Sequence, residues 1–392
     1  MNGRAPRVLV SCGEASGDLY AAALADALKA IDPATGILGL GGPRLRAAGA
    51  DLVGDYEGMA VTGLTEALPV IRRAWRLRAA LCDAARTRRP DVLVAVDSPD
   101  FNFRLLRPMR DLGVPIVYYV SPQLWAWRAG RLDTIRRYVD LMLVIFPFER
   151  AIYERAGVPV EFVGHPLVEL ARPARPREAV LAAAGFDPAR PVLALLPGSR
   201  PNEVRRLLPA MVGSVARVGA RVPGLQVLVA RAPGLNDALF APLAAPVAGA
   251  AVHVLDRAAD DVLAAADAVV TASGTATVQA ALHGTPMVIV YRLSPLTYRL
   301  ARSLVRVRTY GMVNLVAGRR VVPELIQHDV TPDRIAAEVV PLLVDRARAD
   351  AMRRELAGVR AALGAPGASR RAAEAVRRVI DARRAGRPSE PH

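Results

Sequence analysis

The feature that most constrains the fold is a series of short apolar runs, each followed by a polar or glycine-containing loop and then a helical pattern. The clearest run, Asp91 to Val96, is rich in valine and has the length of one buried strand. It ends on Asp97, Ser98 and Pro99, and proline cannot continue a central strand. A strand that is apolar along its whole length suits a parallel sheet covered by helices on both faces.

The same alternation of strands and helices occurs in both halves of the chain. The predicted strands of the first half are Arg7–Ser11, Gly36–Leu40, Asp91–Val96, Ile116–Val120, Leu141–Ile145 and Glu161–Val163. Those of the second half lie near Val192–Leu196, Gln226–Ala230, Ala251–Leu255, Ala268–Thr271 and Met287–Tyr291. Ala171–Arg177, rich in proline and arginine, is the predicted linker between the halves.

We therefore predict an α/β fold with two doubly wound Rossmann-like domains that face a central cleft, and 392 residues suffice for both. The expected ranges are residues 1–170 for the first domain and 171–345 for the second. Residues 346–392 are expected to form C-terminal helices and an Arg-rich tail.

The composition narrows the partners and the compartment. The formal net charge of +15 indicates an anionic partner, such as a phosphorylated substrate, a nucleic acid or an acidic membrane surface. Aromatic residues make up only 5%, which disfavours a surface that stacks nucleic-acid bases. Cys12 and Cys82 are too few for a disulfide framework, and no apolar run approaches the 18 or so residues of a membrane span. We expect a cytoplasmic protein, either soluble or on a membrane surface.

Polar side chains gather where predicted strands end. Asp97, Asp100 and Asn102 follow one strand, and carboxyl ends of parallel strands face the crevice where open α/β sheets bind ligands. The alternative is structural, with Asp97 capping the next helix and Asp100 bracing a loop. The loop from Cys12 to Asp18 likewise allows close approach of a ligand, or only a turn, and it lacks the G-x-G-x-x-G pattern.

Two loops of the second half have the pattern of phosphate sites. Pro197–Arg200 and Ser273–Thr277 each place small residues between a predicted strand and a helix. Free backbone N–H groups and the helix dipole favour an anion there, and Arg200 can add a bidentate contact to a diphosphate. The structural alternative is that these residues only cap helices.

Two basic amphipathic segments indicate either contact with a membrane surface or surface helices packed on their own sheets. In the first, Leu64, Leu68, Ile71 and Trp75 share one helix face beside several arginines. The second runs from Tyr291 to Arg308.

Taken together, several motifs resemble the lipid-A-disaccharide synthase family, whose members are similar to other glycosyltransferases of the two-Rossmann-domain, B type. The resemblance covers about Val8 to Gln327. It rests on Gly13–Asp18, Asp97–Asn102, Tyr119–Pro122, Trp125–Arg128, Leu195–Arg200, Ser273–Ala276 and Asn314–Arg319.

The resemblance implies an inverting transfer of 2,3-diacylglucosamine from UDP to the 6-hydroxyl of 2,3-diacylglucosamine 1-phosphate. The product is the β(1→6)-linked lipid A disaccharide 1-phosphate, and UDP leaves. It also implies no cofactor and no metal, and the five histidines show no metal-ligand spacing. The implied partners are the two lipid substrates and the anionic surface of the inner membrane, without nucleic acid; a homodimer is left open.

The resemblance also implies roles for individual residues. Asp97 is the expected base and Arg200 the expected stabiliser of the departing diphosphate. The expected substrate-binding residues are Glu14, Ser16, Asp100, Asn102, Gly198, Ser199, Ser273, Gly274, Thr275, Gln279 and Asn314. Gln279 stands where related enzymes often carry a glutamate that holds the ribose, so a neutral and weaker acceptor is expected there.

Alternatives stay open at this point. Asp100 or Glu14 is an alternative base to Asp97. Another UDP-sugar enzyme of the same fold, a muramyl-lipid transferase or a UDP-sugar 2-epimerase, is the alternative activity. A nucleic-acid-binding protein and a non-catalytic relative that only binds lipid or nucleotide are more distant alternatives.

Overall fold

The computed structural model describes residues 4–56, 67–122, 130–243, 247, 250–293 and 311–386, with residues 67–70 as backbone only. The chain divides into an N-terminal unit, Met1–Pro166 with Gly364–His392, and a C-terminal unit, Leu167–Leu363. The sequence placed these divisions near residues 170 and 345. Ala171–Arg177, the predicted linker, lies inside the C-terminal unit, where Asp261 accepts hydrogen bonds from the backbone of Ala174 and Arg175.

The N-terminal unit is built on a seven-stranded parallel sheet in the order β3-β2-β1-β4-β5-β6-β7. Its strands are β1 Arg7–Cys12, β2 Gly36–Gly41, β3 Asp51–Asp55, β4 Val92–Val96, β5 Ile116–Tyr119, β6 Leu141–Val144 and β7 Val160–Phe162. The central strand β4 is buried at every position, as its continuous apolar sequence predicts.

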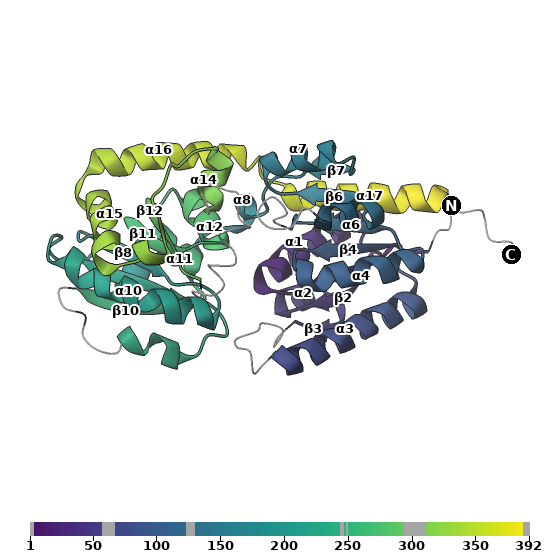
Figure 1. The fold of residues 1–392 in the computed structure, drawn as a ribbon, viewed down its shortest axis with the longest axis horizontal. Helices are drawn as coiled ribbons and strands as arrows, with labels where there is room; N and C mark the ends of the chain where they lie inside the picture. The colour runs from purple at the N-terminus through teal and green to yellow at the C-terminus, as the bar shows by residue number, and fades with distance from the viewer. Residues whose placement is uncertain are drawn as a thin grey trace. The chain divides into compact units, whose positions relative to one another are not determined.

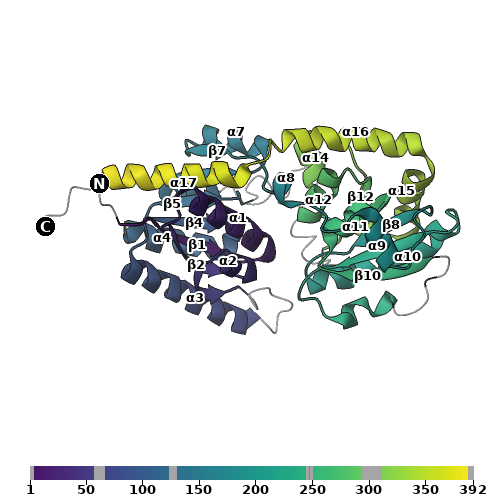
Figure 2. The same ribbon diagram turned by 180° about the vertical axis from the view of Figure 1, so that it is seen from behind.

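Helices cover both faces of this sheet. They are α1 Ala15–Ile31, α2 Pro43–Ala47, α3 Ala67–Arg88, α4 Pro99–Asp111, α6 Gly130–Tyr138, α7 Pro147–Arg155 and, from the end of the chain, α17 Ala368–Ala385. Figure 1 shows α3 and α4 in front of the sheet, and Figure 2 shows α1 and α17 side by side over the opposite face.

The C-terminal unit repeats this plan with six parallel strands in the order β10-β9-β8-β11-β12-β13. The strands are β8 Val192–Leu196, β9 Gln226–Arg231, β10 Ala251–Asp256, β11 Ala268–Ala272, β12 Met287–Tyr291 and β13 Glu324–Ile326. The helices are α8 Leu167–Leu170, α9 Arg177–Ala183, α10 Pro201–Gly219, α11 Ala259–Ala265, α12 Thr275–His283, α14 Met312–Ala317, α15 Pro332–Val344 and α16 Arg346–Ala362. Two 3₁₀ helices span Asp237–Leu243 and Gln327–Asp329.

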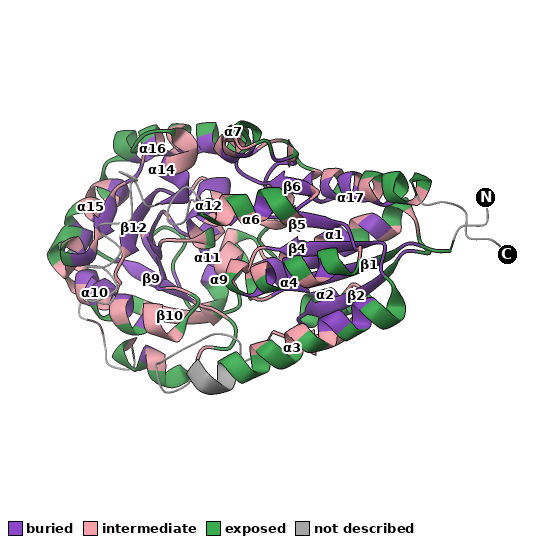
Figure 3. Ribbon diagram, turned by 45° about the vertical axis from the view of Figure 1, so that its right-hand side comes forward, coloured by how far each residue is buried: buried purple, intermediate pink, exposed green. Residues whose placement is uncertain are grey.

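In both units the core lies between the central strands and the inner faces of the helices, and outer helix faces are exposed (Figure 3). The two doubly wound Rossmann-like units confirm the predicted fold class, while the central cleft between them stays a prediction. Among the described residues no helix is long and apolar enough to cross a membrane.

Strand order places the candidate loops. The chain reverses its direction across the sheet between β1 and β4 in the N-terminal unit, and between β8 and β11 in the C-terminal unit. In doubly wound sheets, ligands bind outside the carboxyl ends of the strands at such switch points. The loops after β1, β4, β8 and β11 are those that hold most of the predicted site residues.

Candidate active site

Backbone strain marks the end of β4. Asp97 and Ser98 have φ values of 48° and 45°, and Val120, which follows β5 on the neighbouring strand, has φ 69°. Each non-glycine residue in this left-handed region costs on the order of 1–3 kcal/mol, and such strain is concentrated at functional sites. The sequence did not predict the strained backbone of Ser98 and Val120, because such strain depends on the contacts that surround these residues.

The backbone of Asp97 is fixed by its neighbours. Its N–H donates to the Tyr119 carbonyl at 2.9 Å. Its own carbonyl accepts from the Tyr118 hydroxyl at 2.7 Å and from the Asn102 amide at 2.8 Å. The half-buried carboxylate of Asp97 therefore starts from a rigidly held position at the edge of the sheet.

Asn102 is a positioning residue. It is fully buried in α4, and its Oδ1 accepts from the Ser11 hydroxyl at 2.6 Å. Its Nδ2 donates to the carbonyls of Ser11 and Val96, both at 3.2 Å, as well as to Asp97. The side chain of Asn102 has no exposed surface and joins the ends of β1 and β4, and the substrate contact predicted for it stays a prediction.

The loop after β1 is joined to the turn after β4. The Gly13 N–H donates to the Ser98 hydroxyl oxygen at 2.9 Å. Glu14, half-buried and extended, precedes α1, and Ser16 is half-buried in the first turn of that helix. The structure thus places Glu14 on the loop that contacts the Asp97 turn and Ser16 in the helix that follows this loop.

Asp100 lies at the start of α4 with an arginine that the sequence analysis did not single out. Its side chain is 89% exposed and forms an ion pair with Arg131 at 2.5 Å. The Arg131 guanidinium also lies 5.0 Å from the ring centroid of Phe103. Because Arg131 belongs to α6, only the folded chain brings it to Asp100.

Two buried titratable side chains, Tyr20 and His165, stack edge to face with their ring centroids 6.0 Å apart. Burial, and secondarily the charge of Asp97, raises the pKa of the Tyr20 hydroxyl. Burial lowers the pKa of His165 to about 3, so this imidazole is neutral at physiological pH. His165 also packs against Phe146 at 5.2 Å, and a structural role follows from these contacts.

Asp18, in the motif after β1, has a structural task. Its buried carboxylate accepts from the backbone N–H groups of Gly42 at 2.8 Å, Arg44 at 3.0 Å and Leu45 at 3.1 Å. These amides form the N-terminus of α2, whose exposed donors need a partner. Asp18 therefore caps a helix that lies in the following β–α unit.

In the first predicted phosphate loop, the backbone N–H groups already donate to a carboxylate of the helix that follows. Glu203 accepts from the backbone N–H of Ser199 at 3.0 Å and of Arg200 at 3.3 Å. Gly198, at φ 123°, leaves room for it, since a Cβ there would lie 2.6 Å from Glu203 Oε2. The amides expected to bind phosphate at the start of α10 are thus occupied, and the 58% exposed guanidinium of Arg200 remains as the group that can reach an anion.

The second predicted phosphate loop differs from the first. Gly274, at φ 139°, precedes Thr275, the first residue of α12, and Ser273 and Thr275 are partly or fully exposed. Within the described residues no carboxylate accepts from the amides of Thr275 and Ala276. The N-terminus of α12 is therefore better suited to a phosphate than that of α10.

Gln279 and Asn314 have contrasting environments. Gln279 is half-buried on α12, and its Nε2 donates to Asp260 Oδ1 at 3.1 Å. Asn314 is fully buried; its Nδ2 donates to Glu324 at 2.6 Å, and its Oδ1 accepts from the N–H groups of Val321 and Val322. Asn314 thus bridges α14 and the backbone before β13, and the substrate contact predicted for it stays a prediction.

Some predicted features lie outside the described residues. They are Leu64, the motif Trp125–Arg128 and most of the second amphipathic segment, from residue 294 to 308. Leu68 falls on α3, in the part where only the backbone is described.

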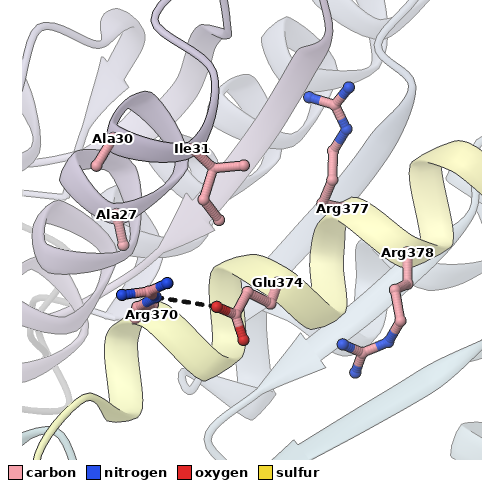
Figure 4. Close-up of a pocket in the computed structure, with 7 residues that line it drawn as sticks. All are labelled: Ala27, Ala30, Ile31, Arg370, Glu374, Arg377 and Arg378. Atoms are coloured by element: carbon pink, nitrogen blue, oxygen red, sulfur yellow. Dashed lines mark hydrogen bonds and ion pairs between the residues drawn. The ribbon is translucent and has the colours of Figure 1, made fainter.

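A separate pocket lies between α1 and α17 of the N-terminal unit (Figure 4). None of the predicted site residues lines it. Its three arginines are ion-paired: Arg370 with Glu374 at 3.0 Å, Arg377 with Asp32 at 2.8 Å and Arg378 with Glu161 at 2.7 Å. The pocket therefore offers no uncompensated charge to a ligand.

Two doubly wound sheets, with carboxylates at one switch point and an open helix N-terminus at the other, define the class of the two-Rossmann-domain, B-type glycosyltransferases. The calicheamicin glycosyltransferase CalG4 shares this fold with a TM-score of 0.60 and 18% identity, over 97% of this chain and 99% of its own. The Staphylococcus aureus MnaA–UDP complex has a TM-score of 0.69 and 11% identity, over 99% and 100% of the two chains. At these identities the likeness concerns the fold alone.

Sequence comparison identifies the family. The family model described as lipid-A-disaccharide synthetase matches residues 8–379. The lipid-A-disaccharide synthase of Geobacter sulfurreducens is 46% identical over 367 residues, 94% of this chain and 95% of that protein. The chain belongs to the lipid-A-disaccharide synthetase family.

The activity is that of a hexosyltransferase. It moves 2,3-diacylglucosamine from UDP to the 6-hydroxyl of 2,3-diacylglucosamine 1-phosphate, and gives the lipid A disaccharide 1-phosphate and UDP. Membership of this family decides against the muramyl-lipid transferase and the UDP-sugar 2-epimerase that the sequence left open.

Proposed function

We propose that the N-terminal unit binds the acceptor at the ends of β1 and β4 and that Asp97 removes the proton from its 6-hydroxyl. A donor sugar that is α-linked to UDP and becomes β-linked in the product is inverted at its anomeric carbon. A single displacement with one base achieves this inversion. The strained, fully braced turn of Asp97 at the switch point is the observation that carries this assignment.

The structure favours Asp97 over the two alternative bases. Asp100 is 89% exposed and paired with Arg131, so water and the guanidinium both bind the carboxylate that would have to accept the proton. Glu14 lies on a loop before α1 without comparable backbone strain. The backbone of Asp97 is held by hydrogen bonds with Tyr118, Tyr119 and Asn102, which favours proton transfer in a fixed geometry.

The C-terminal unit is proposed to bind the UDP part of the donor. Its diphosphate lies at the N-terminus of α12, where the backbone of Ser273, Gly274 and Thr275 and the helix dipole stabilise the charge that develops as UDP leaves. Arg200 supplies a guanidinium for the same diphosphate, since Glu203 leaves much of it exposed. Gln279, one turn further along α12, contacts the ribose. The UDP bound to MnaA, a neighbour in fold, is consistent with this assignment.

The membrane partner is proposed to be the anionic surface of the inner membrane, contacted by α3. Ile71 is 50% and Trp75 49% exposed, beside exposed Arg72 and Arg76. Acyl chains on both substrates require that the protein works at a lipid surface. The apolar side chains enter the interface while the arginines contact anionic headgroups.

A product assay tests the proposed chemistry. Purified protein is incubated with both lipid substrates, and the disaccharide and UDP are quantified for wild type and Asp97→Asn. Loss of a general base lowers the rate by about 100- to 10,000-fold. Asp111→Asn, an exposed carboxylate at the other end of α4, is the matched control and keeps wild-type activity.

Asp100→Asn and Glu14→Gln are measured in the same assay. If Asp97→Asn keeps its activity while one of these variants loses it, the base lies elsewhere and the assignment is wrong. Circular dichroism on each variant shows that any loss of rate is not a loss of fold.

A further inference from the structure

One face of α12 carries a line of polar side chains below the proposed diphosphate loop. Thr275, Gln279 and His283 occupy positions i, i+4 and i+8, so they lie on the same side of the helix. Thr275 is exposed and the other two are partly buried, whereas Thr277, Val278 and the three residues from Ala280 to Leu282 are buried. Gln279 therefore lies one turn from the residue that opens the helix.

Asp260, in the first turn of α11, contacts two members of this line. Its Oδ1 accepts from His283 Nε2 at 2.8 Å and from Gln279 Nε2 at 3.1 Å. The His283 side chain is 8% and that of Asp260 25% exposed, so the bonds are largely shielded from water. α11 packs against α12, and both helices start at the carboxyl edge of the same sheet.

This contact fixes which way the Gln279 amide points. An ionised carboxylate only accepts hydrogen bonds, so the amide NH₂ of Gln279 must face Asp260 and its Oε1 must face away. Within the described residues no other group donates to that oxygen. The arrangement presents one acceptor of known orientation beside the loop at the start of α12.

We propose that Asp260, which also forms a hydrogen bond with His283, is a positioning residue that holds Gln279 so that its Oε1 accepts a hydrogen bond from a ribose hydroxyl of the nucleotide. The inference rests on the proposed binding of UDP at the N-terminus of α12. A glutamine whose amide is already hydrogen-bonded to Asp260 loses less conformational entropy when the ligand binds. Donation by its NH₂ to a carboxylate also polarises the amide, which makes Oε1 a stronger acceptor.

The arrangement explains how a neutral side chain serves at this position. The negative charge is on Asp260, which contacts Gln279, and the group proposed to touch the ribose is the neutral amide of Gln279. Like charges repel each other, and the repulsion falls with distance. A carboxylate that contacts Gln279 therefore repels the phosphates less than a carboxylate that touches the ribose. Asp260 thus supplies the charge and Gln279 supplies the contact.

The test measures the affinity of the whole protein for UDP and for 2′,3′-dideoxy-UDP by calorimetry. The ratio of the two affinities reports the ribose contact and does not respond to a general loss of stability. Wild type is expected to prefer UDP by about tenfold, the value of one or two preorganised hydrogen bonds. Asp260→Ala and Gln279→Leu should each reduce this ratio to near one, and the double variant should be no lower than Gln279→Leu alone.

Conservative and control variants separate positioning from folding. Asp260→Asn keeps an oxygen that can accept from Gln279, so it should retain most of the ratio. Glu178→Ala deletes an exposed carboxylate on the neighbouring α9 and should leave the ratio unchanged. Gln279→Glu places a second carboxylate about 3 Å from Asp260 and should weaken UDP binding at pH 8, and a Gln279→Glu protein that binds UDP as well as wild type overturns the inference.

The two proposals fail in different ways. A wild-type protein that does not bind UDP overturns both the nucleotide site and the positioning role. A wild type that binds UDP, with an Asp260→Ala variant that keeps the full preference for UDP over the dideoxy nucleotide, overturns the positioning role alone.

Discussion

Asn102 and Asn314 have the same structural role in the two units. Each is a fully buried asparagine whose amide bonds backbone groups next to a strand, Asn102 where β1 and β4 end and Asn314 just before β13 begins. Such a residue offers donors and an acceptor within one short side chain, so it satisfies several buried backbone groups at once. Both residues belong to motifs of the family, and the structure gives those motifs a physical reason other than ligand contact.

Replacing Asn102 with Ala should destabilise the N-terminal unit strongly. The variant leaves the hydroxyl of Ser11 and the carbonyls of Val96 and Asp97 without their present partner, and it creates a cavity. We expect a loss of roughly 2–4 kcal/mol in the free energy of unfolding, measured by urea denaturation. Exposed Asn236→Ala is the control, with a loss of at most about 1 kcal/mol. Equal midpoints for the two variants would contradict the bracing role.

At the scale of elements, the apolar residues of α3 are exposed near the start of the helix and buried further along it. Leu81, Cys82 and Ala85 pack into the core under the sheet, with Leu77 partly buried beside them. Ile71 and Trp75 lie outside that contact surface. The Trp75 ring is flanked by Arg78 at 4.7 Å and by Arg104 of α4 at 5.7 Å. Packing on the sheet therefore accounts for the later part of α3 and leaves Ile71 and Trp75, nearer its start, for a different partner.

The exposed apolar residues near the start of α3 should hold the protein on anionic membranes. Replacing Leu68, Ile71 and Trp75 with Ser removes apolar area and should lower the bound fraction on phosphatidylglycerol-containing vesicles by at least tenfold. Ile31→Ser and Leu112→Ser remove exposed apolar side chains elsewhere in the N-terminal unit and serve as controls. Vesicle sedimentation measures binding. If the triple variant sediments like wild type, α3 is not the membrane contact.

At the scale of the whole molecule, the last described helix returns to the first part of the chain. α17 packs on α1, and Arg384 donates to the buried carboxylate of Asp91 at 2.9 Å. The Arg7 N–H donates to the same carboxylate at 2.9 Å, and Arg4 lies 3.4 Å from it. Arg371, also on α17, donates to the carbonyls of Val163, Ala365 and Pro366, which lie where the chain enters and leaves the C-terminal unit.

Asp91 should make the stability of the N-terminal unit depend on acid pH. Burial acts to raise the pKa of its carboxyl, but the hydrogen bonds from Arg384 and the Arg7 N–H outweigh burial, and the pKa lies below its ordinary value. The stabilisation is therefore complete above the ordinary pKa of about 4 and is lost as the pH falls through the lower, folded-state value.

Asp91→Asn measures this contribution. The variant should be roughly 1–3 kcal/mol less stable than wild type at pH 7, and the difference should shrink as the pH falls below about 4. Chemical denaturation across this pH range provides the comparison, with Asp83→Asn at an exposed ion pair as the control. A difference that persists unchanged at pH 2 would contradict the assignment.

The order of the elements and the family were both readable in the sequence. A continuous apolar run such as Val92–Val96 is buried on both faces in the middle of a parallel sheet that helices cover. The sequence therefore predicts the central strands well. The edge strands Asp51–Asp55 and Glu324–Ile326 were not predicted, because they are short and only partly buried or polar at one end. The loops that follow the central strands lie at the carboxyl edge of each sheet, as the sequence predicted, because the direction of a strand alone decides at which edge its following loop begins.

What each polar residue does was decided by the tertiary structure. The sequence shows that Asn102, Asp18 and Glu203 are polar and close to candidate loops, but not that the first is fully buried or that the other two cap helix N-termini. The bond between Gln279 and Asp260 joins two helices across 19 positions of the chain. Local patterns report which face of an element is apolar. Hydrogen bonds between side chains depend on how the elements pack, and only the folded molecule brings those atoms within reach of each other.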